Sequence, residues 1–386
     1  MIDSRKIPTE AELVALLRQG RLLLPPVTIT EVRDAGESAN RRSQDKEFRR
    51  DAVAEVRWGK RKYRFAVACR SLATPKALTA AIAEARRRAN PPRLYPLVLV
   101  PYLSPERVGA LEEEQLSGLD ACGNGVLIVP GELLIFRTGA PNQFPRSDRI
   151  GNVYRRTSSL VARVFLLVPE FNSLGDAAQE TARRGGKVTI ATVSKVCSTM
   201  DSDLVLDRQR SKGAKNRQLR LIQPDKLLDL LAENYVPPAL GGTVTGKYSK
   251  SPDELRNALA ALKEKTGERV VLTGAGSVDA YAVMAREPLE PFYCSDVRGL
   301  LEWLGDDFKE TTRFANVTFL ETREDFVYFD VRPGLVASPI QTYLELTTGD
   351  KRDRETAEQV RRLILAPLQR KPDAGSTDGP AANQPA

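Results

Sequence analysis

Strand-like apolar runs alternate with helix-like stretches along the chain, and this alternation constrains the fold more than any other sequence feature. The clearest run is Tyr95–Tyr102, whose continuous apolar character is typical of a strand buried inside a sheet. Helical stretches flank it at Thr74–Arg88 and Ser104–Leu116. Further elements are expected as a helix at Thr9–Gln19 and strands at Ala52–Trp58, Tyr63–Cys69, Gly125–Pro130 and Glu132–Arg137. We therefore expect an α/β domain over residues 1–150.

The segment from about residue 155 to 235 has a different pattern of expected elements, with several helices and a short ribbon. Helices are expected at Ser158–Val168, Leu174–Arg183, Ile190–Met200 and Pro224–Asn234, and a two-stranded ribbon at 204–206 and 219–222. Ser173 is a candidate N-cap for the second helix. The residues expected to be buried together are Val164, Leu167, Leu174, Ala178, Val193 and Val196, with Ile190 at the same helical spacing.

Residues 236–366 again combine expected strands with expected helices. Strands are expected at Arg269–Leu272, Asn316–Leu320 and Phe326–Val331, and helices at Ser251–Lys265, Val278–Arg286, Val297–Leu304, Pro339–Thr347 and Thr356–Leu365. Residues 367–386 are rich in Pro, Gly, Ala, Ser and Asn, and we expect a disordered tail there. The expected fold class is α/β and α+β, in several domains.

The chain of 386 residues contains no histidine. This excludes Ser-His-Asp and Cys-His nucleophilic sites, His-ligated zinc and imidazole acid–base chemistry. The cysteines, Cys69, Cys122, Cys197 and Cys294, form no C-x-x-C pair, so a zinc knuckle is not expected and a reduced, cytoplasmic protein is favoured. The N-terminus lacks a signal-peptide core, and no apolar run is long enough to cross a bilayer. We expect no enzymatic activity, no metal, no cofactor and no membrane.

The net charge of +8 predicts an anionic partner, and nucleic acid is the first expectation. Ten basic side chains and three aspartates lie between Arg183 and Arg220, a net charge of +7 within a tenth of the chain. The order of three helices and a hairpin in this segment resembles a winged helix-turn-helix domain. The alternative is a small helical linker with a solvated basic loop.

The candidate DNA-binding residues form two groups. On the third helix they are Thr189, Thr192, Ser194, Lys195 and Ser198, with Thr199 also expected to face outward. Short polar side chains and one lysine allow a helix to enter the major groove of duplex DNA. On the hairpin they are Arg208, Arg210, Lys212, Lys215 and Arg217, placed where a wing follows the phosphates.

The N-terminal segment resembles nucleases of the PD-(D/E)XK type, the restriction endonuclease-like fold. In these enzymes an Asp begins one strand, a Glu and a Lys two residues apart end the next strand, and the carboxylates bind Mg²⁺. Asp51 begins the first strand here and Glu55 follows on it, but Ala68 and Arg70 occupy the Glu and Lys positions. Ala68 cannot bind a metal, and Arg70 does not deprotonate.

A downstream stretch, Gly118–Gly125 with Asp120 and Asn124, strengthens this resemblance because related domains carry a similar Asp-x-x-Gly-Asn stretch. The resemblance implies a degenerate, inactive domain that touches DNA or serves as an accessory. An α/β dimerisation or packing domain of another fold is an equal alternative. An active Mg²⁺-dependent nuclease that uses Asp51 and Glu55 is the further alternative.

Three stretches of the C-terminal segment are distinctive: Arg269–Ser277, Arg313–Thr318 and Ser338–Leu346, the last continuing through Gly349–Ala357. Together they resemble the C-terminal domain of AbiEi-type antitoxins, the transcriptional-regulator half of type IV toxin–antitoxin systems, over residues 227–365. The resemblance implies a repressor of its own operon that binds an operator in double-stranded DNA. We expect a homodimer on the DNA because an inverted-repeat operator mirrors a two-fold axis of the protein. The resemblance also implies a nucleotidyltransferase-like toxin as partner, and leaves direct contact with that toxin open. A protein-interaction module with an incidental basic loop is the other function considered.

The sequence Gly274-Ala275-Gly276-Ser277 follows a strand and resembles the start of a nucleotidyltransferase site. Such sites need an Asp-x-Asp pair for two metals, and neither Asp279 nor Asp296 belongs to one. We expect the glycines to allow a tight turn into the next helix. A phosphate-binding loop is the weaker alternative because G-x-x-x-x-G-K-[ST] is absent.

Overall fold

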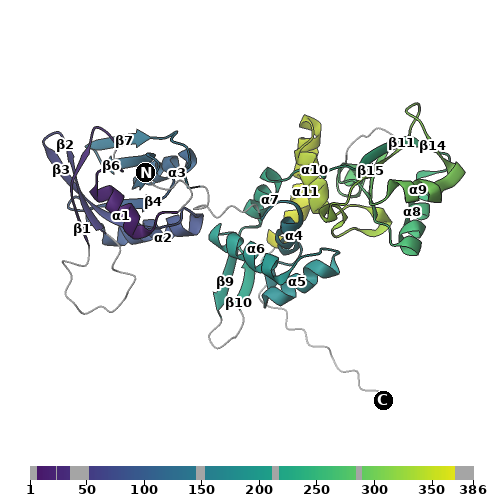
Figure 1. Ribbon diagram of the computed structural model, residues 1–386, viewed down its shortest axis with the longest axis horizontal. Coiled ribbons are helices and arrows are strands. Elements are labelled where there is room, and N and C mark those ends of the chain that lie inside the picture. Colours follow the sequence, from purple (N-terminus) through teal and green to yellow (C-terminus); the bar gives the residue numbers. More distant parts are fainter. Residues whose placement is uncertain are drawn as a thin grey trace, which may run out of the picture. The chain divides into compact units, whose positions relative to one another are not determined.

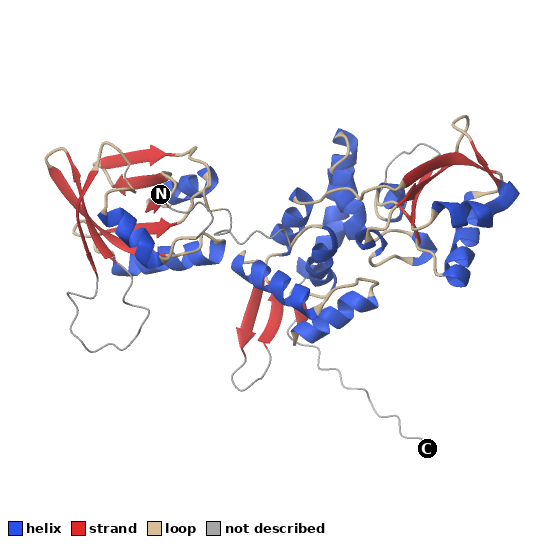
Figure 2. Ribbon diagram, viewed as in Figure 1, coloured by secondary structure: helices blue, strands red, loops and turns tan. Residues whose placement is uncertain are grey.

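The computed structural model describes residues 7–22, 24–34, 52–144, 153–210, 217–283 and 289–369, without the side chains of Asp34, Arg210 and Arg217. These residues form a mixed α/β protein with three sheets (Figures 1 and 2). The chain divides into two compact units. Unit 1 is Met1–Gly151 with Thr199–Leu204, and unit 2 is Asn152–Ser198 with Val205–Ala386.

The described part of unit 1 contains one seven-stranded mixed sheet whose strands lie in chain order. The strands are β1 (Thr28–Asp34), β2 (Ala52–Trp58), β3 (Arg61–Cys69), β4 (Tyr95–Val100), β5 (Ser117–Asp120), β6 (Gly125–Val129) and β7 (Leu133–Arg137). The helices are α1 (Glu10–Arg18), α2 (Pro75–Arg88) and α3 (Pro105–Glu113). Strands β3, β4 and β5 are mutually parallel because α2 and α3 form the crossovers between them, and the other neighbours are antiparallel.

Each face of this sheet has its own apolar core. Leu13 and Leu17 of α1 pack against Phe65 and other residues on one face. Ala81 of α2 and Val108 of α3 belong to the core on the opposite face. The buried residues of β3 divide between the two cores because successive side chains of a strand point to opposite faces.

Unit 2 begins with helices and a small sheet. The elements are α4 (Ser159–Leu167), β8 (Glu170–Phe171), α5 (Leu174–Arg183), α6 (Ile190–Ser202), β9 (Leu206–Arg210), β10 (Arg217–Leu221) and α7 (Pro224–Glu233). The sheet order is β8-β10-β9, and all pairs are antiparallel. Figure 2 shows β9 and β10 projecting as a hairpin from the helices.

The remainder of unit 2 contains a five-stranded sheet in the order β12-β13-β15-β11-β14. Its elements are β11 (Gly242–Tyr248), α8 (Pro252–Thr266), β12 (Val270–Leu272), β13 (Glu290–Cys294), α9 (Val297–Leu304), β14 (Phe308–Glu310), β15 (Val317–Glu321), α10 (Pro339–Thr347) and α11 (Lys351–Gln369). Strands β13 and β15 are parallel, and the other pairs are antiparallel. Leu259 of α8 and Leu300 of α9 pack on Phe292 and Phe319 of the sheet.

A buried arginine joins the two parts of unit 2. Arg163 of α4 is 1% exposed, and its Nη1 donates to Oε1 of Gln341 on α10 at 2.8 Å and to the carbonyl oxygen of Phe326 at 3.2 Å. Burial lowers the pKa of Arg163 to about 10. On the surface, Arg361 of α11 forms an ion pair with Asp229 of α7. Helix α4 is therefore fixed to α10 and to the segment around Phe326, and α7 is joined to α11.

Most sequence-predicted helices, and the strands at 52–58, 95–102 and 125–137, are confirmed to within a few residues. Two predictions in the C-terminal segment are wrong. The segment predicted as a strand at Phe326–Val331 contains a 3₁₀ helix, Asp325–Tyr328. The α-helix predicted at Val278–Arg286 is absent from the described part of that range, residues 278–283, where a 3₁₀ helix, Ala275–Ala280, ends instead. Short apolar runs do not distinguish strands from other buried segments.

Other differences concern the ends and connections of elements. Strands β1, β5, β8, β11 and β14 were not predicted. Helix α11 continues through Pro367 to Gln369, so the predicted disorder is wrong for residues 367–369; the rest of the predicted tail, residues 370–386, lies outside the described residues. Of the helices in the described ranges, none combines the length and apolar character that crossing a bilayer requires.

Candidate nucleic-acid interface

Helix α6 presents a polar face outward and an apolar face inward. Val193, Val196 and Cys197 are fully buried. Lys195 is exposed, and the predicted residues Thr192, Ser194 and Ser198 have intermediate exposure. Positions 191, 195 and 198 recur at helical spacing and so share one side of α6. Apart from Lys195, the side chains at these positions, Ala191 and Ser198, are short.

Three residues at the two ends of α6 have roles or exposures that the sequence did not predict. The hydroxyl of Thr189 accepts a hydrogen bond from the backbone N–H of Thr192 at 3.2 Å, so this exposed side chain caps the helix. Ile190, predicted to face the core, is 55% exposed, whereas Thr199, predicted to face outward, is 8% exposed. Helical periodicity shows which side chains share a face of a helix. It does not show how far the neighbouring elements cover each face.

The hairpin after α6 places its arginines differently from the prediction. Arg208 and Arg210 lie in β9 and Arg217 lies in β10, rather than in the loop between the strands. The pairs Arg217↔Arg210 and Leu219↔Arg208 set the register. The loop residues Lys212 and Lys215, and the side chains of Arg210 and Arg217, lie outside the described residues.

Arg208 is not a simple surface cation. Its side chain has intermediate exposure, and its Nε is buried without a hydrogen-bond partner among the described residues. It lies close enough to Cys197 of α6 to oppose the effect of burial, which raises the pKa of that thiol to about 12. Arg208 is therefore a partly buried cation of the hairpin rather than a fully exposed one.

The charge of +7 counted along the sequence overstates the charge of this surface. Nε and Nη2 of Arg183 each donate to a carboxylate oxygen of Glu180 at 2.7 Å. Arg184 donates to Glu180 at 2.8 Å and to Asp330 at 2.6 Å, and Arg220 pairs with Glu170 at 3.2 Å. All three carboxylates lie outside residues 183–220, so a count along the chain could not include them.

The comparison with nuclease sites depends on strands β2 and β3. Glu55 of β2 pairs in register with Arg64 of β3, and Ala68 lies four residues farther along β3. At about 3.4 Å per residue this separation is roughly 14 Å. Ala68 is fully buried in the core on the α2 side, and Asp51 lies outside the described residues. Glu55 is therefore far from the position where a nuclease would need the missing ligand.

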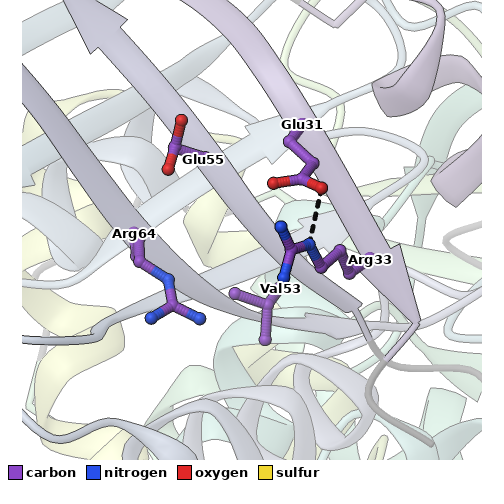
Figure 3. Close-up of a pocket in the computed structure, with 5 residues that line it drawn as sticks. All are labelled: Glu31, Arg33, Val53, Glu55 and Arg64. Atoms are coloured by element: carbon purple, nitrogen blue, oxygen red, sulfur yellow. Dashed lines mark hydrogen bonds and ion pairs between the residues drawn. The ribbon is translucent and has the colours of Figure 1, made fainter. Parts of the chain in front are cut away.

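A small surface cavity does surround Glu55, as Figure 3 shows. Its volume is about 190 Å³, and the lining residues are Glu31, Arg33, Val53, Glu55 and Arg64. Glu31 forms an ion pair with Arg33, and Glu55 pairs with Lys62 at 2.8 Å and accepts from Thr30 at 2.9 Å. The contacts with Lys62 and Thr30 lower the pKa of Glu55, and the hydrogen bond from Lys62 has the largest effect. Within the described ranges, no three His, Cys, Asp or Glu residues are grouped to hold a metal.

Asp120 and Asn124, noted in the sequence, organise a loop. The carboxylate of Asp120 accepts hydrogen bonds from the backbone N–H groups of Leu103, Cys122, Gly123 and Asn124 at 2.7–2.9 Å. The Asn124 amide also donates to this carboxylate and exchanges hydrogen bonds with the backbone of Ala140. Burial raises the pKa of Asp120, and the hydrogen bonds oppose that effect.

The glycine-rich stretch after β12 is tightly packed. A Cβ at Gly274 would lie 2.7 Å from the carbonyl oxygen of Gln341, so α10 approaches the backbone closely. The carboxylate of Glu345 accepts from the N–H of Ala275 at 3.0 Å, and Ser277 accepts from the N–H of Ala337. Gly274 has ordinary right-handed helical dihedral angles, so the glycine is required for the close approach of α10 and not, as predicted, for a tight turn.

All four cysteines have free thiols. No protein-family model, curated protein or solved structure matches the chain.

Proposed function

We propose that this chain is a DNA-binding transcriptional regulator. The observation that carries the proposal is the element order α4-β8-α5-α6-β9-β10, in which a helix with a polar outer face is followed by an antiparallel hairpin. Winged helix-turn-helix domains place such a helix in the major groove and such a hairpin along the phosphates. The exposed Lys195 and the hairpin cations supply the charge.

The resemblance to AbiEi antitoxins extends the proposal. The regulator represses its own operon as a homodimer on an inverted repeat, and its partner is a nucleotidyltransferase-like toxin encoded nearby. Unit 1 serves as an accessory domain of nuclease-like fold with a degenerate site. The antiparallel meander β1-β2-β3 and the crossover through α2 to parallel β4, with Ala68 and Arg70 at the end of β3, support this part.

The test is binding of the full-length chain to a labelled DNA duplex, followed by anisotropy over a range of salt concentrations. One variant replaces the hairpin cations Arg208, Arg210, Lys212, Lys215 and Arg217 with alanine. Each lost phosphate contact lowers the dependence of log K on log salt by about 0.9, so losing all five lowers the slope by roughly 4.5. The matched control replaces Lys247, Lys309, Arg313, Lys351 and Arg352, which are exposed and change the net charge equally.

The expected result is weaker binding of the hairpin variant to every sequence, with the control unchanged. Equal binding by the hairpin variant and the parent contradicts the assignment of the hairpin, and no salt-dependent binding by the parent favours the protein-interaction module. Duplexes from DNA beside the gene, and co-expression with a neighbouring nucleotidyltransferase-like gene, test autorepression and antitoxin activity separately.

The alternative function is a Mg²⁺-dependent nuclease, favoured by the strand arrangement of unit 1. Incubation with supercoiled plasmid and Mg²⁺ or Mn²⁺ tests it. We expect no cleavage. Cleavage that an Asp51→Ala variant abolishes would assign the nuclease activity to unit 1.

A further inference from the structure

Unit 2 contains a concave, strongly basic pocket at the turn between α5 and α6. Its volume is about 540 Å³, within the range of small-molecule sites. The basic lining residues are Arg183, Arg184, Lys187, Lys263, Arg269 and Arg332, and the acidic one is Asp330. One wall comes from the α5–α6 turn, and the other comes from α8, the start of β12 and the segment around Asp330.

Carboxylates hold the arginines of this pocket in place. Asp330 is 8% exposed and accepts from Arg184 at 2.6 Å and from Arg332 at 2.7 Å. Glu180 binds Arg183 and Arg184, and Asp325 forms an ion pair with Arg269. A guanidinium has five N–H groups, so each arginine keeps donors beyond its ion pairs. Because these groups are already ordered, a ligand spends little free energy in fixing them.

Two lysines complete the lining. Lys187 and Lys263 are exposed, and neither has an ion-pair partner among the described residues. The six cations of the pocket therefore face three carboxylates, Glu180, Asp325 and Asp330, which leaves a local charge of +3. Such an excess in a concave site attracts an anion of several charges.

We propose that this pocket binds a small polyanion that carries phosphate groups, with a charge close to −3. Arginine N–H groups match the geometry of phosphate oxygens, and lysine supplies additional point charge. The ring of Tyr328 is covered by Arg269 at 4.4 Å, and its hydroxyl donates to Thr322, so the ring offers no open face to a nucleobase. Recognition therefore depends on the phosphate groups.

The pocket adjoins the proposed DNA-binding helix, because Lys187 lies three residues before the start of α6. A consequence that rests on the proposed function is competition between the ligand and DNA phosphates for Arg183 and Lys187. A bound polyanion is then expected to lower the affinity for duplex DNA.

The closing experiment measures ligand binding directly by calorimetry on the full-length chain and does not depend on DNA binding. The probes are tripolyphosphate, ATP and inorganic phosphate, with a glutamate peptide of matched charge as the control for charge alone. The test variant is Lys187→Gln with Lys263→Gln. Its matched control is Lys247→Gln with Lys309→Gln, an exposed pair on β11 and β14 that lies outside the pocket lining.

We expect saturable binding of tripolyphosphate at one site, weakened at least tenfold in the test variant and unchanged in the control. Binding of ATP as tight as that of tripolyphosphate shows that the pocket accepts a nucleoside attached to the phosphates without recognising the base, and weaker binding of ATP indicates a non-nucleotide polyphosphate. No saturable binding, equal binding by the test variant, equal loss in the control, or equally tight binding of the glutamate peptide would overturn the proposal. If duplex DNA alone loses affinity in the test variant, these cations belong to the DNA interface instead.

Discussion

Replacing Arg163 tests how the first helix of unit 2 is held against the C-terminal part. This side chain is 1% exposed, and its Nη1 donates to Gln341 and to the carbonyl oxygen of Phe326. Its Nε is buried without a hydrogen-bond partner among the described residues. Two substitutions are informative: Arg163→Met retains most of the volume, and Arg163→Ala removes it.

The expected magnitudes follow from opposing effects. Burial lowers the pKa of Arg163 from 12.5 to about 10, which corresponds to a cost of about 3 kcal/mol for the buried charge. Removing the guanidinium relieves that cost but leaves two oxygen acceptors without a donor, each at about 1–3 kcal/mol. The two effects nearly cancel for Arg163→Met, so we expect destabilisation of about 1 kcal/mol. Arg163→Ala adds a cavity and costs about 2–5 kcal/mol more.

The assay is urea unfolding followed by tryptophan fluorescence. The chain has two tryptophans, Trp58 in β2 of unit 1 and Trp303 in α9 of unit 2. A Trp58→Phe background therefore restricts the signal to Trp303, whose indole N–H donates to the carbonyl of Ala258 at 2.9 Å. Far-ultraviolet circular dichroism of the same samples detects any separate unfolding of the helices around Arg163. Arg352→Ala, an exposed change on α11, serves as control and is expected to shift stability by less than about 0.5 kcal/mol.

The relative losses of stability in Arg163→Met and Arg163→Ala test this reasoning. If Arg163→Met costs as much as Arg163→Ala, the buried charge contributes net stability and the desolvation argument is wrong. If Arg163→Ala costs less than about 1 kcal/mol, the hydrogen bonds to Gln341 and Phe326 do not hold the two parts of unit 2 together.

Two further predictions concern carboxylates. Hydrogen bonds from Arg183 and Arg184 lower the pKa of Glu180 from 4.5 to about 2, so this carboxylate stabilises unit 2 above pH 4.5 and the stabilisation is lost as the pH falls from about 4.5 to about 2. Acid unfolding of Glu180→Gln, followed by Trp303 fluorescence, should therefore be less steep than that of the parent across this range, and identical profiles would contradict the assignment. Asp120→Ala leaves several buried N–H groups without an acceptor, and we expect it to destabilise unit 1 by about 3–5 kcal/mol, measured by Trp58 fluorescence in a Trp303→Phe background. Ser104→Ala removes only the partly buried N-cap of α3 and serves as the comparison; we expect it to destabilise unit 1 by about 1 kcal/mol.

Sequence patterns predicted the helices better than the strands. Helix α5 matches the predicted range Leu174–Arg183, and Ser173 accepts from the N–H of Asp176 as its N-cap. Helical periodicity and capping are local properties, so the sequence of a single segment contains them. Strand β8 has two residues, Glu170 and Phe171, and exists because β10 pairs with it. No local pattern identifies so short a strand.

The candidate interface was predicted in part. The sequence identified α6 and placed Val193 and Val196 in the core, which their burial confirms, but it assigned Ile190 and Thr199 to the wrong faces. It did not show that Thr189 caps the helix or that Arg208 is half-buried beside Cys197. The basic pocket was missed because its residues come from separate segments, although Arg183, Arg184 and Lys187 were counted among the local cations.

The sequence by itself determined the residue types available for chemistry, the apolar periodicity of the main helices and the surplus of cations near α6, because these are properties of composition and local order. Only the tertiary structure decided which cations keep their charge exposed. Glu170, Glu180 and Asp330 approach Arg220, Arg183 and Arg184 through folding, and Lys187 and Lys263 meet at one pocket although 76 positions separate them in the chain. Electrostatic interactions depend on distance in space, and the sequence specifies that distance only through the folded packing of the whole unit.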